Sequence, residues 1–297
     1  MRKAEKFAIG LVQMTLTPEP GANLRRAVDL VGRAAKDGAS IVCLPELFRT
    51  LYFCQMEDAK SFDLAEPVPG PSTEAIAAIA KERKVTVIAP VFERRAAGLF
   101  HNSAAVIGPG GDIIGLYRKM HIPDDPGYYE KFYFTPGDLG YQVFDTQVGR
   151  FGTLICWDQW YPEAARLTSL RGAEVLFFPT AIGWHPREKT QQGAAQLDAW
   201  VTIQRSHAIA NGVYVAGVNR AGLERPIDGE GIEFWGGTFL SDPFGVVVAR
   251  ANTGGEEIVL GEIDPSRIEE VRRNWPFLRD RRIDSYAELG KRFIEEK

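Results

Sequence analysis

Cys156 stands at a point in the chain where a thiol could act as a nucleophile. The run Phe151–Ile155 before it is almost wholly apolar, which is typical of a buried strand. Pro162 suits the first turn of a following helix, because its missing N–H would have no partner there. A thiol at such a strand-to-helix corner faces a cleft whose backbone N–H groups can hold an oxyanion. Taken alone, a free cysteine is more often a small buried hydrophobic residue. A role of Cys156 as nucleophile therefore depends on other side chains that could activate its thiol.

Glu46 and Lys119 are the candidate partners, since each lies at the end of a predicted strand. Glu46 ends the run 40–46 and is flanked by apolar residues, and a carboxylate in such a partly dry setting can act as a general base. Lys119 follows the strand predicted over 113–118, where its ammonium would offset the charge of a thiolate or an oxyanion. Considered singly, either residue is more often a solvated charge at the end of a strand.

Glu130 lies in the aromatic-rich segment 128–137. A carboxylate among aromatic side chains either faces water or is held by a cationic partner, and we favour Lys119 as that partner. His121 is one of only four histidines and belongs to no Cys/His arrangement. We therefore expect His121 to have a structural role rather than to serve as the base.

The elements that must position these residues alternate between strands and helices. The strands are almost continuously apolar, which indicates a sheet covered by helices. The first half of the chain predicts strands over 7–13, 40–46, 85–92, 99–107 and 113–118, and helices over 23–37, capped by Asn23, and 72–84. The second half predicts strands over 173–179, 213–218, 236–240, 245–249 and 257–264, and helices starting at 162, 193 and 265.

The composition is that of a globular α/β protein, with 297 residues of which 45% are hydrophobic and 25% charged. A formal net charge of −4 does not favour nucleic acid or an anionic membrane as a partner. Cys43, Cys54 and Cys156 match no zinc or redox spacing, and so low a count suggests a reducing compartment. The charged N-terminus lacks the apolar core of a signal peptide, so we expect a cytoplasmic protein. No cluster of metal ligands is apparent in the sequence, and we expect neither a metal nor a cofactor.

Three short motifs resemble those of the nitrilase superfamily: Leu44-Pro-Glu46, Tyr117-Arg-Lys119 and Leu154-Ile-Cys156-Trp-Asp158, in that order. The resemblance extends from Phe7 to about Pro265. It implies an α/β fold built as a four-layer α-β-β-α sandwich. It also implies hydrolysis of non-peptide C–N bonds, with Cys156 as nucleophile, Glu46 as base, Lys119 as the cation and Glu130 supporting that lysine.

The same resemblance suggests how the chain is organised. Residues 1–265 would form the hydrolase domain, and residues 266–297 a helix and tail that pack at a subunit interface. Members of the superfamily commonly form dimers or larger homo-oligomers, so we expect a homo-oligomer here.

Two stretches, 157–163 and 124–138, are most similar to N-carbamoylputrescine amidases within that superfamily. Relatives that hydrolyse carbamoyl amino acids tend to carry an arginine after the cysteine, where this chain has Gln159 and Trp160. The absence of an arginine fork suits a neutral or cationic tail on the substrate. An amine would require aromatic faces and an acid, for which the candidates are Tyr52, Trp157, Trp184, Asp125 and Glu188.

Three functions remain open. The first is hydrolysis of N-carbamoylputrescine, a small ureido substrate, to putrescine, ammonia and carbon dioxide. The second is hydrolysis of N-carbamoyl amino acids such as N-carbamoyl-β-alanine, for which Arg187 or Arg205 would have to supply the carboxylate clamp. The third is a non-enzymatic interaction module, although such a module has no need of Glu46, Lys119 and Cys156 together.

Overall fold

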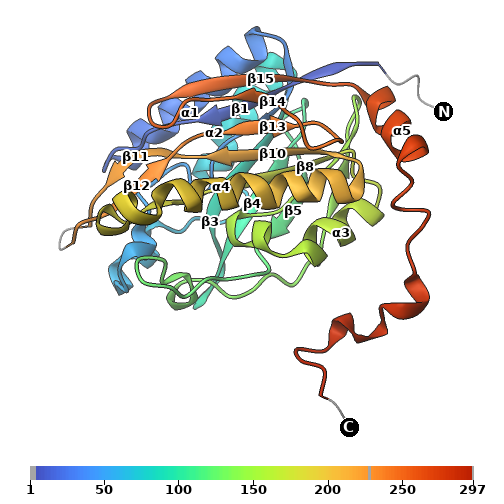
Figure 1. The fold of residues 1–297 in the computed structure, drawn as a ribbon. Helices are drawn as coiled ribbons and strands as arrows, with labels where there is room; N and C mark the ends of the chain where they lie inside the picture. The colour runs from blue at the N-terminus through green and yellow to red at the C-terminus, as the bar shows by residue number, and fades with distance from the viewer. Residues whose placement is uncertain (1–4, 227–228, 296–297) are drawn as a thin grey trace.

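Two six-stranded sheets form the centre of the computed structural model, which describes residues 5–226 and 229–295 (Figure 1). The first sheet has the order β15-β1-β2-β3-β4-β5, with bounds Glu257–Ile263, Phe7–Gln13, Ala39–Cys43, Thr86–Ala96, Leu99–Ile107 and Ile113–Arg118. Strands β1, β2 and β3 are parallel, and the others join antiparallel. Their nearly continuous apolar residues allow burial on both faces.

The second sheet repeats this plan with the order β14-β13-β10-β8-β7-β6. Its strands span Val247–Arg250, Phe239–Ser241, Tyr214–Asn219, Val175–Thr180, Arg150–Thr153 and Val143–Asp145, and β7, β8 and β10 are parallel. Side chains of both sheets meet in one core, where Ile9 and Ile88 pack in the same cluster as Phe151 and Phe177. Burying each of these phenylalanines contributes roughly 1.5–3 kcal/mol, so the contact between the sheets is a main source of stability.

Helices cover the outer face of each sheet. On the first sheet lie α1 (Pro20–Lys36) and α2 (Pro71–Arg83), and on the second lie α3 (Pro162–Leu170) and α4 (Pro186–Asn211). All four helices begin with a proline, a residue that loses no hydrogen bond in the first turn. The expected four-layer α-β-β-α sandwich is confirmed.

Some element boundaries differ from the predicted ones. Helix α1 begins at Pro20, and Asn23 is not its cap, because its side chain is engaged with Thr17 and the carbonyl of Arg49. Helix α4 begins at Pro186 instead of residue 193, so Glu188 lies in its first turn. A small third sheet, β11-β12-β9, was not predicted, because its strands Ala221–Glu224, Ile232–Trp235 and Gly183–Trp184 are very short.

The last helix, α5 (Pro265–Asn274), packs on the body through Ile268 and Val271. The chain after it extends from the sandwich, and its described part contains the short 3₁₀ turns η5 (Ile283–Ser285) and η6 (Ala287–Gly290) (Figure 1). Other 3₁₀ turns are η1 (Phe53–Gln55), η2 (Ala59–Leu64), η3 (Glu130–Phe132) and η4 (Cys156–Trp160). Within the described residues, every helix is too short or too polar to cross a lipid bilayer.

Candidate active site

Lys119 lies just after β5 and is completely buried. Its Nζ donates to Glu46 Oε1 at 2.8 Å and to Glu130 Oε2 at 2.6 Å. Burial alone would lower the pKa of Lys119, but the carboxylates of Glu130 and Glu46 outweigh burial and hold that pKa well above its ordinary value. Lys119 is therefore a fixed cation between two acids. Its contact with Glu130 is the one that the sequence predicts.

Glu46 follows β2 and is also completely buried. Its Oε1 accepts from Lys119 and, at 2.7 Å, from Nδ2 of Asn102 on β4. Its Oε2 is buried and has no hydrogen-bond partner among the described residues. One oxygen of this carboxylate is thus held in place, and the other is available to take a proton.

Glu130, the first residue of η3, is held on both sides. Its Oε2 accepts from Lys119, and its Oε1 accepts at 2.7 Å from the hydroxyl of Tyr52. Burial raises the pKa of Glu130 to about 7, although Lys119 opposes that rise, while the nearby charge of Glu46 adds to it.

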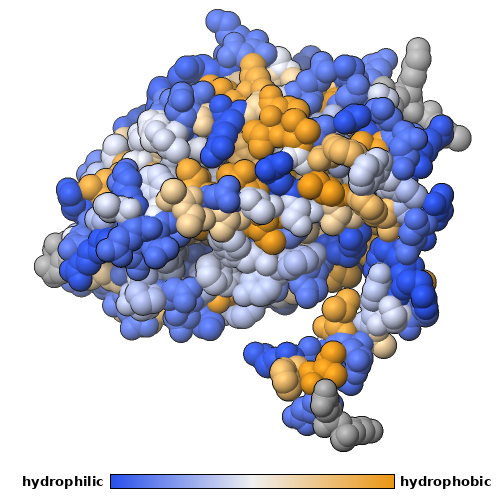
Figure 2. Space-filling model, viewed as in Figure 1, coloured by the Kyte–Doolittle hydropathy of each residue, from blue (hydrophilic) through white to orange (hydrophobic). Residues whose placement is uncertain are grey.

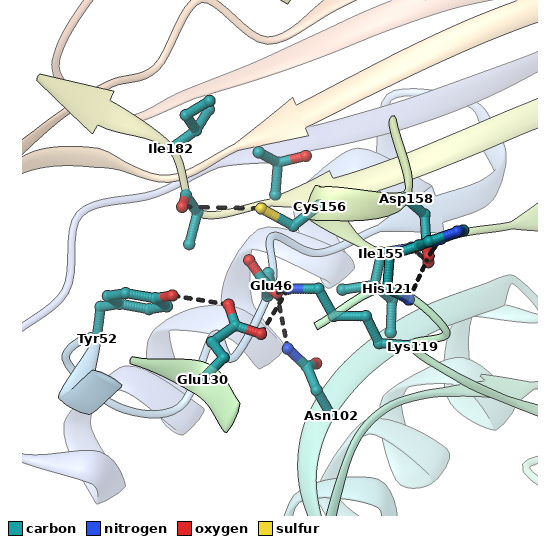
Figure 3. Close-up of polar contacts among 12 residues, drawn as sticks. Glu46, Tyr52, Asn102, Lys119, His121, Glu130, Ile155, Cys156, Asp158 and Ile182 are labelled. Atoms are coloured by element: carbon teal, nitrogen blue, oxygen red, sulfur yellow. Dashed lines mark hydrogen bonds and ion pairs between the residues drawn. The ribbon is translucent and has the colours of Figure 1, made fainter. Parts of the chain in front are cut away.

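Cys156 opens η4 directly after the buried residues Leu154 and Ile155. Its φ of 42° is unusual for a residue other than glycine, and such strained conformations gather at functional sites. Burial, and then the charge of Glu46, raises the pKa of Cys156 well above its ordinary value, while Lys119 opposes this. Figure 3 shows Cys156 gathered with Glu46 and Lys119, so three side chains far apart in sequence meet at one place.

Asp158 holds the turn that carries Cys156. Its Oδ2 accepts from the backbone N–H of Ile155 at 2.9 Å and from the hydroxyl of Tyr117 at 2.7 Å. Its Oδ1 accepts from the backbone N–H of His121 at 3.0 Å and lies 2.7 Å from His121 Nδ1 (Figure 3). The ring of His121 stacks on Tyr161 with a centroid distance of 3.8 Å. These contacts fit the predicted structural role of His121, because they tie the segment after Lys119 to the cysteine turn.

A cavity of about 390 Å³ opens at Cys156. Trp157, Asp125 and Glu188 line it, as predicted for a substrate pocket, and both acids are exposed, so they lie at its mouth. Aromatic walls come from Tyr128, Trp160 and Trp235. No lysine or arginine is found among the lining residues within the described chain. The cavity therefore presents negative charge and aromatic faces to a ligand.

Tyr52 and Trp184, also predicted to bind substrate, lie elsewhere. Both are absent from the lining of that cavity within the described chain. Tyr52 is buried, and its hydroxyl donates to Glu130. The indole N–H of Trp184 donates to the carbonyl of Gly193 at 2.9 Å, which turns this side chain toward α4. These two residues act as supports of the surrounding structure, and their predicted contact with substrate is corrected accordingly.

The arginines that a carbamoyl amino acid would require are also placed outside the cavity. Arg187 Nε donates to Glu230 at 2.8 Å on the exposed surface. Arg205 Nε donates to the carbonyl of Gly245 at 2.6 Å. Neither guanidinium lines the cavity at Cys156 in the described part of the chain.

Residues that the sequence interpretation did not identify complete the site. Asn102 donates to the carboxylate of Glu46. Arg220 is paired with Glu224 and donates to the backbone carbonyl of Glu46. An asparagine inside the apolar strand 99–107 was a usable signal, because a buried amide needs a partner. Arg220 and Glu224 carried no such signal, since charges at the end of a strand are ordinarily solvated. Across residues 5–226 and 229–295 no group of three or more His, Cys, Asp or Glu side chains is arranged to hold a metal ion.

A sandwich of this kind, with cysteine, lysine and two glutamates converging at its centre, defines a hydrolase of the nitrilase type. The carbon-nitrogen hydrolase profile matches residues 8–273, and the chain belongs to this family. It is an amidohydrolase acting on C–N bonds.

Several relatives match over nearly their whole length. The N-carbamoylputrescine amidase of Solanum lycopersicum is 41% identical over 97% of this chain and 96% of its own length. The citrullinase of Francisella tularensis is 37% identical over 96% of this chain and 98% of its own. The crystal structure of a carbon-nitrogen hydrolase from Helicobacter pylori G27 is 47% identical, covers 98% of this chain and 100% of that one, and superimposes with a TM-score of 0.94.

Proposed function

We propose that this enzyme hydrolyses N-carbamoylputrescine to putrescine, ammonia and carbon dioxide. The observation that carries the proposal is the cavity at Cys156, whose lining holds Asp125 and Glu188 and, within the described residues, no lysine or arginine. A ureido group can reach the thiol there while a terminal ammonium stays near the two acids at the mouth. The similarity to N-carbamoylputrescine amidases supports the same substrate.

Catalysis begins with the thiol proton of Cys156 passing to Glu46, whose Oε2 is free to accept it. The sulfur attacks the ureido carbonyl carbon, and the carbonyl oxygen becomes an oxyanion. Lys119 and the backbone N–H of Trp157 stabilise that oxyanion, and the loss of one donor of this kind typically costs about 3–4 kcal/mol. Glu46 then returns the proton to the leaving ammonia, and a thioester-type carbamoyl intermediate remains on Cys156.

A water molecule then hydrolyses the carbamoyl intermediate on Cys156. Glu46 takes a proton from a water molecule, which attacks the carbonyl carbon of the intermediate. The bond to sulfur breaks, and the thiol of Cys156 regains its proton from Glu46. The product is a carbamic acid, which releases carbon dioxide and leaves putrescine.

The alternative substrate class, N-carbamoyl amino acids, has less support. Its carboxylate would meet Asp125 and Glu188, and like charges repel in a partly desolvated cavity. Arg187 and Arg205, the predicted clamps, make their contacts elsewhere. A non-enzymatic role is excluded by membership of the hydrolase family together with the enzymatic relatives.

Ammonia release from a panel of N-carbamoylputrescine, N-carbamoyl-β-alanine and citrulline tests the proposal. We expect the highest kcat/KM for N-carbamoylputrescine, because it alone carries a cationic tail without a carboxylate. A higher kcat/KM for either amino acid would contradict the proposed specificity.

A variant pair tests whether charge at the mouth of the cavity selects the substrate. Glu188→Gln should raise KM for N-carbamoylputrescine about tenfold, equivalent to about 1.4 kcal/mol. Glu230→Gln is the matched control, because Glu230 is exposed and lies outside the cavity at Cys156. Equal effects of both substitutions would mean that general surface charge, and not Glu188, attracts the substrate.

We also propose that the enzyme works as a cytoplasmic homo-oligomer, a dimer or a larger assembly. The exposed apolar side chains of the C-terminal segment support a subunit contact, because large apolar groups are costly to leave in water. The three unpaired cysteines are consistent with a reducing compartment.

A further inference from the structure

A buried ion pair lies beside the catalytic centre without lining its cavity. Arg220 directly follows β10 and is fully buried, and Glu224 ends β11 with only 3% of its surface exposed. Arg220 Nη1 lies 3.0 Å from both carboxylate oxygens of Glu224. Neither residue belongs to the described lining of the cavity at Cys156, so the pair has no direct access to a substrate there.

The pair is instead attached to the backbone of the segment 46–52. Arg220 Nη2 donates to the carbonyl oxygens of Glu46 at 2.6 Å and Leu47 at 3.0 Å, and Nη1 donates to that of Thr50 at 3.2 Å. Glu224 Oε2 accepts from the backbone N–H of Tyr52 at 2.6 Å. Two side chains of the second half of the chain thus hold four backbone groups of this segment.

The geometry explains why a guanidinium is used here. Leu47 has a φ of 50°, so the segment leaves the strand ladder and its buried carbonyls must find other donors. A planar guanidinium presents several donors in a fixed arrangement, whereas a lysine ammonium is a compact point charge. Glu224 neutralises the guanidinium, because an unpaired buried charge would be destabilising.

The segment that the pair holds carries two groups of the catalytic centre. Glu46 contributes Oε2, which has no partner in the described part of the chain, and Tyr52 donates its hydroxyl to Glu130. We propose that Arg220 and Glu224 are positioning residues, which fix the backbone at Glu46 and Tyr52 so that Oε2 of Glu46 reaches the thiol of Cys156. The inference rests on the proposed role of Glu46 as base and does not depend on which ureido compound is the substrate.

Alkylation of Cys156 by iodoacetamide, followed by peptide mass spectrometry, measures this positioning directly. In the wild type the rate should be nearly constant between about pH 6.5 and 8.5, because Glu46 accepts the proton during attack. In Glu46→Gln it should rise about tenfold for each pH unit, because only thiolate already present can react. We expect Arg220→Lys to follow the Glu46→Gln profile and to react at least about tenfold more slowly than the wild type at pH 7.

The matched control is Arg272→Lys. Arg272 of α5 also donates to a backbone carbonyl, with Nε and Nη2 both 3.2 Å from the oxygen of Asn211, but at the end of α4 outside the site. This variant should keep the flat wild-type profile. Buried Cys43 and Cys54 should stay unlabelled in every folded variant and so report on folding.

Each outcome has one meaning. If the wild type and Glu46→Gln share one profile, the proposed base is wrong. If they differ and a folded Arg220→Lys retains the flat profile, the positioning proposal is overturned. Should Arg220→Lys fail to fold, Glu224→Gln takes its place, because it preserves the shape of the pair. It should also give a rate that rises with pH, and a flat profile there would overturn the proposal.

Discussion

At the scale of single residues, the two oxygens of Glu46 have different tasks. Oε1 is held by Lys119 and Asn102, whereas Oε2 has no hydrogen-bond partner among the described residues. Burial, and then the charge of Glu46, raises the pKa of the Cys156 thiol, which favours its neutral form. In the proposed mechanism, the nucleophile is generated during attack on a substrate, when Glu46 removes the proton.

The raised pKa of Glu130 predicts a pH-dependent stability. The pKa of Glu130 is about 7 in the folded protein, against 4.5 as the reference value. Between these two pH values the folded state holds a proton that the unfolded chain has released. This stabilisation is fully present below about pH 4.5 and is lost as the pH rises through about 7. Glu130→Gln should remove that loss, which is on the order of 3 kcal/mol.

Urea denaturation at about pH 5 and about pH 8 measures this difference in the free energy of unfolding. Glu230→Gln controls for the removal of one surface carboxylate and should retain the wild-type pH dependence. If Glu130→Gln and the wild type lost the same stability between the two pH values, the proton would reside on another group.

The sequence predicts three side chains that the structure brings together, Cys156, Glu46 and Lys119, but it does not predict all the residues that support them. Cys156, Glu46 and Lys119 lie in the three motifs that resemble those of the nitrilase superfamily, and this resemblance distinguishes them from ordinary solvated charges at strand ends. Tyr52 was assigned to the substrate because an aromatic ring near a cleft suits an amine, but its hydroxyl is needed by Glu130. Arg220 could not be found in this way, since its partners are backbone carbonyls about 170 residues away.

At the scale of elements, the site forms where the ends of strands in both sheets meet. Glu46 and Lys119 follow β2 and β5 of the first sheet, whereas Cys156 and Ala181 follow β7 and β8 of the second. The thiol of Cys156 lies 3.9 Å from the carbonyl oxygen of Ala181, so β8 also orients the nucleophile. Face-to-face packing of the sheets thus assembles the catalytic centre.

Long strands and helices could be predicted because their apolar periodicity extends over many residues. The strand predicted over 99–107 has the observed bounds of β4. The small sheet that includes β9 could not be predicted, since two residues display no periodicity. The start of α4 was placed too late because its first two turns are polar and exposed, which resembles a loop.

At the scale of the whole molecule, the C-terminal segment 275–295 extends away from the sandwich and carries exposed apolar side chains (Figures 1 and 2). Ile283 is 73% exposed, Leu289 67% and Phe293 79%. Such side chains gain roughly 1.5–3 kcal/mol each when buried, which favours contact with another subunit. This is the part of the chain that we expect to stabilise a homo-oligomer.

Replacing Ile283, Leu289 and Phe293 together by serine should weaken subunit association at least about tenfold, because apolar area no longer leaves water. Sedimentation velocity at several protein concentrations measures this. The thermal stability of the separated subunit should not change, since the three side chains are exposed. A wild-type chain that sediments as a monomer would contradict the proposed assembly.

The most direct test of the account is rapid-quench mass spectrometry of the enzyme mixed with N-carbamoylputrescine. We predict a transient adduct equal in mass to the substrate minus ammonia, located on the peptide that contains Cys156 and absent from Cys156→Ser. Turnover of the substrate by Cys156→Ser, or an adduct on any other residue, would contradict the proposed mechanism.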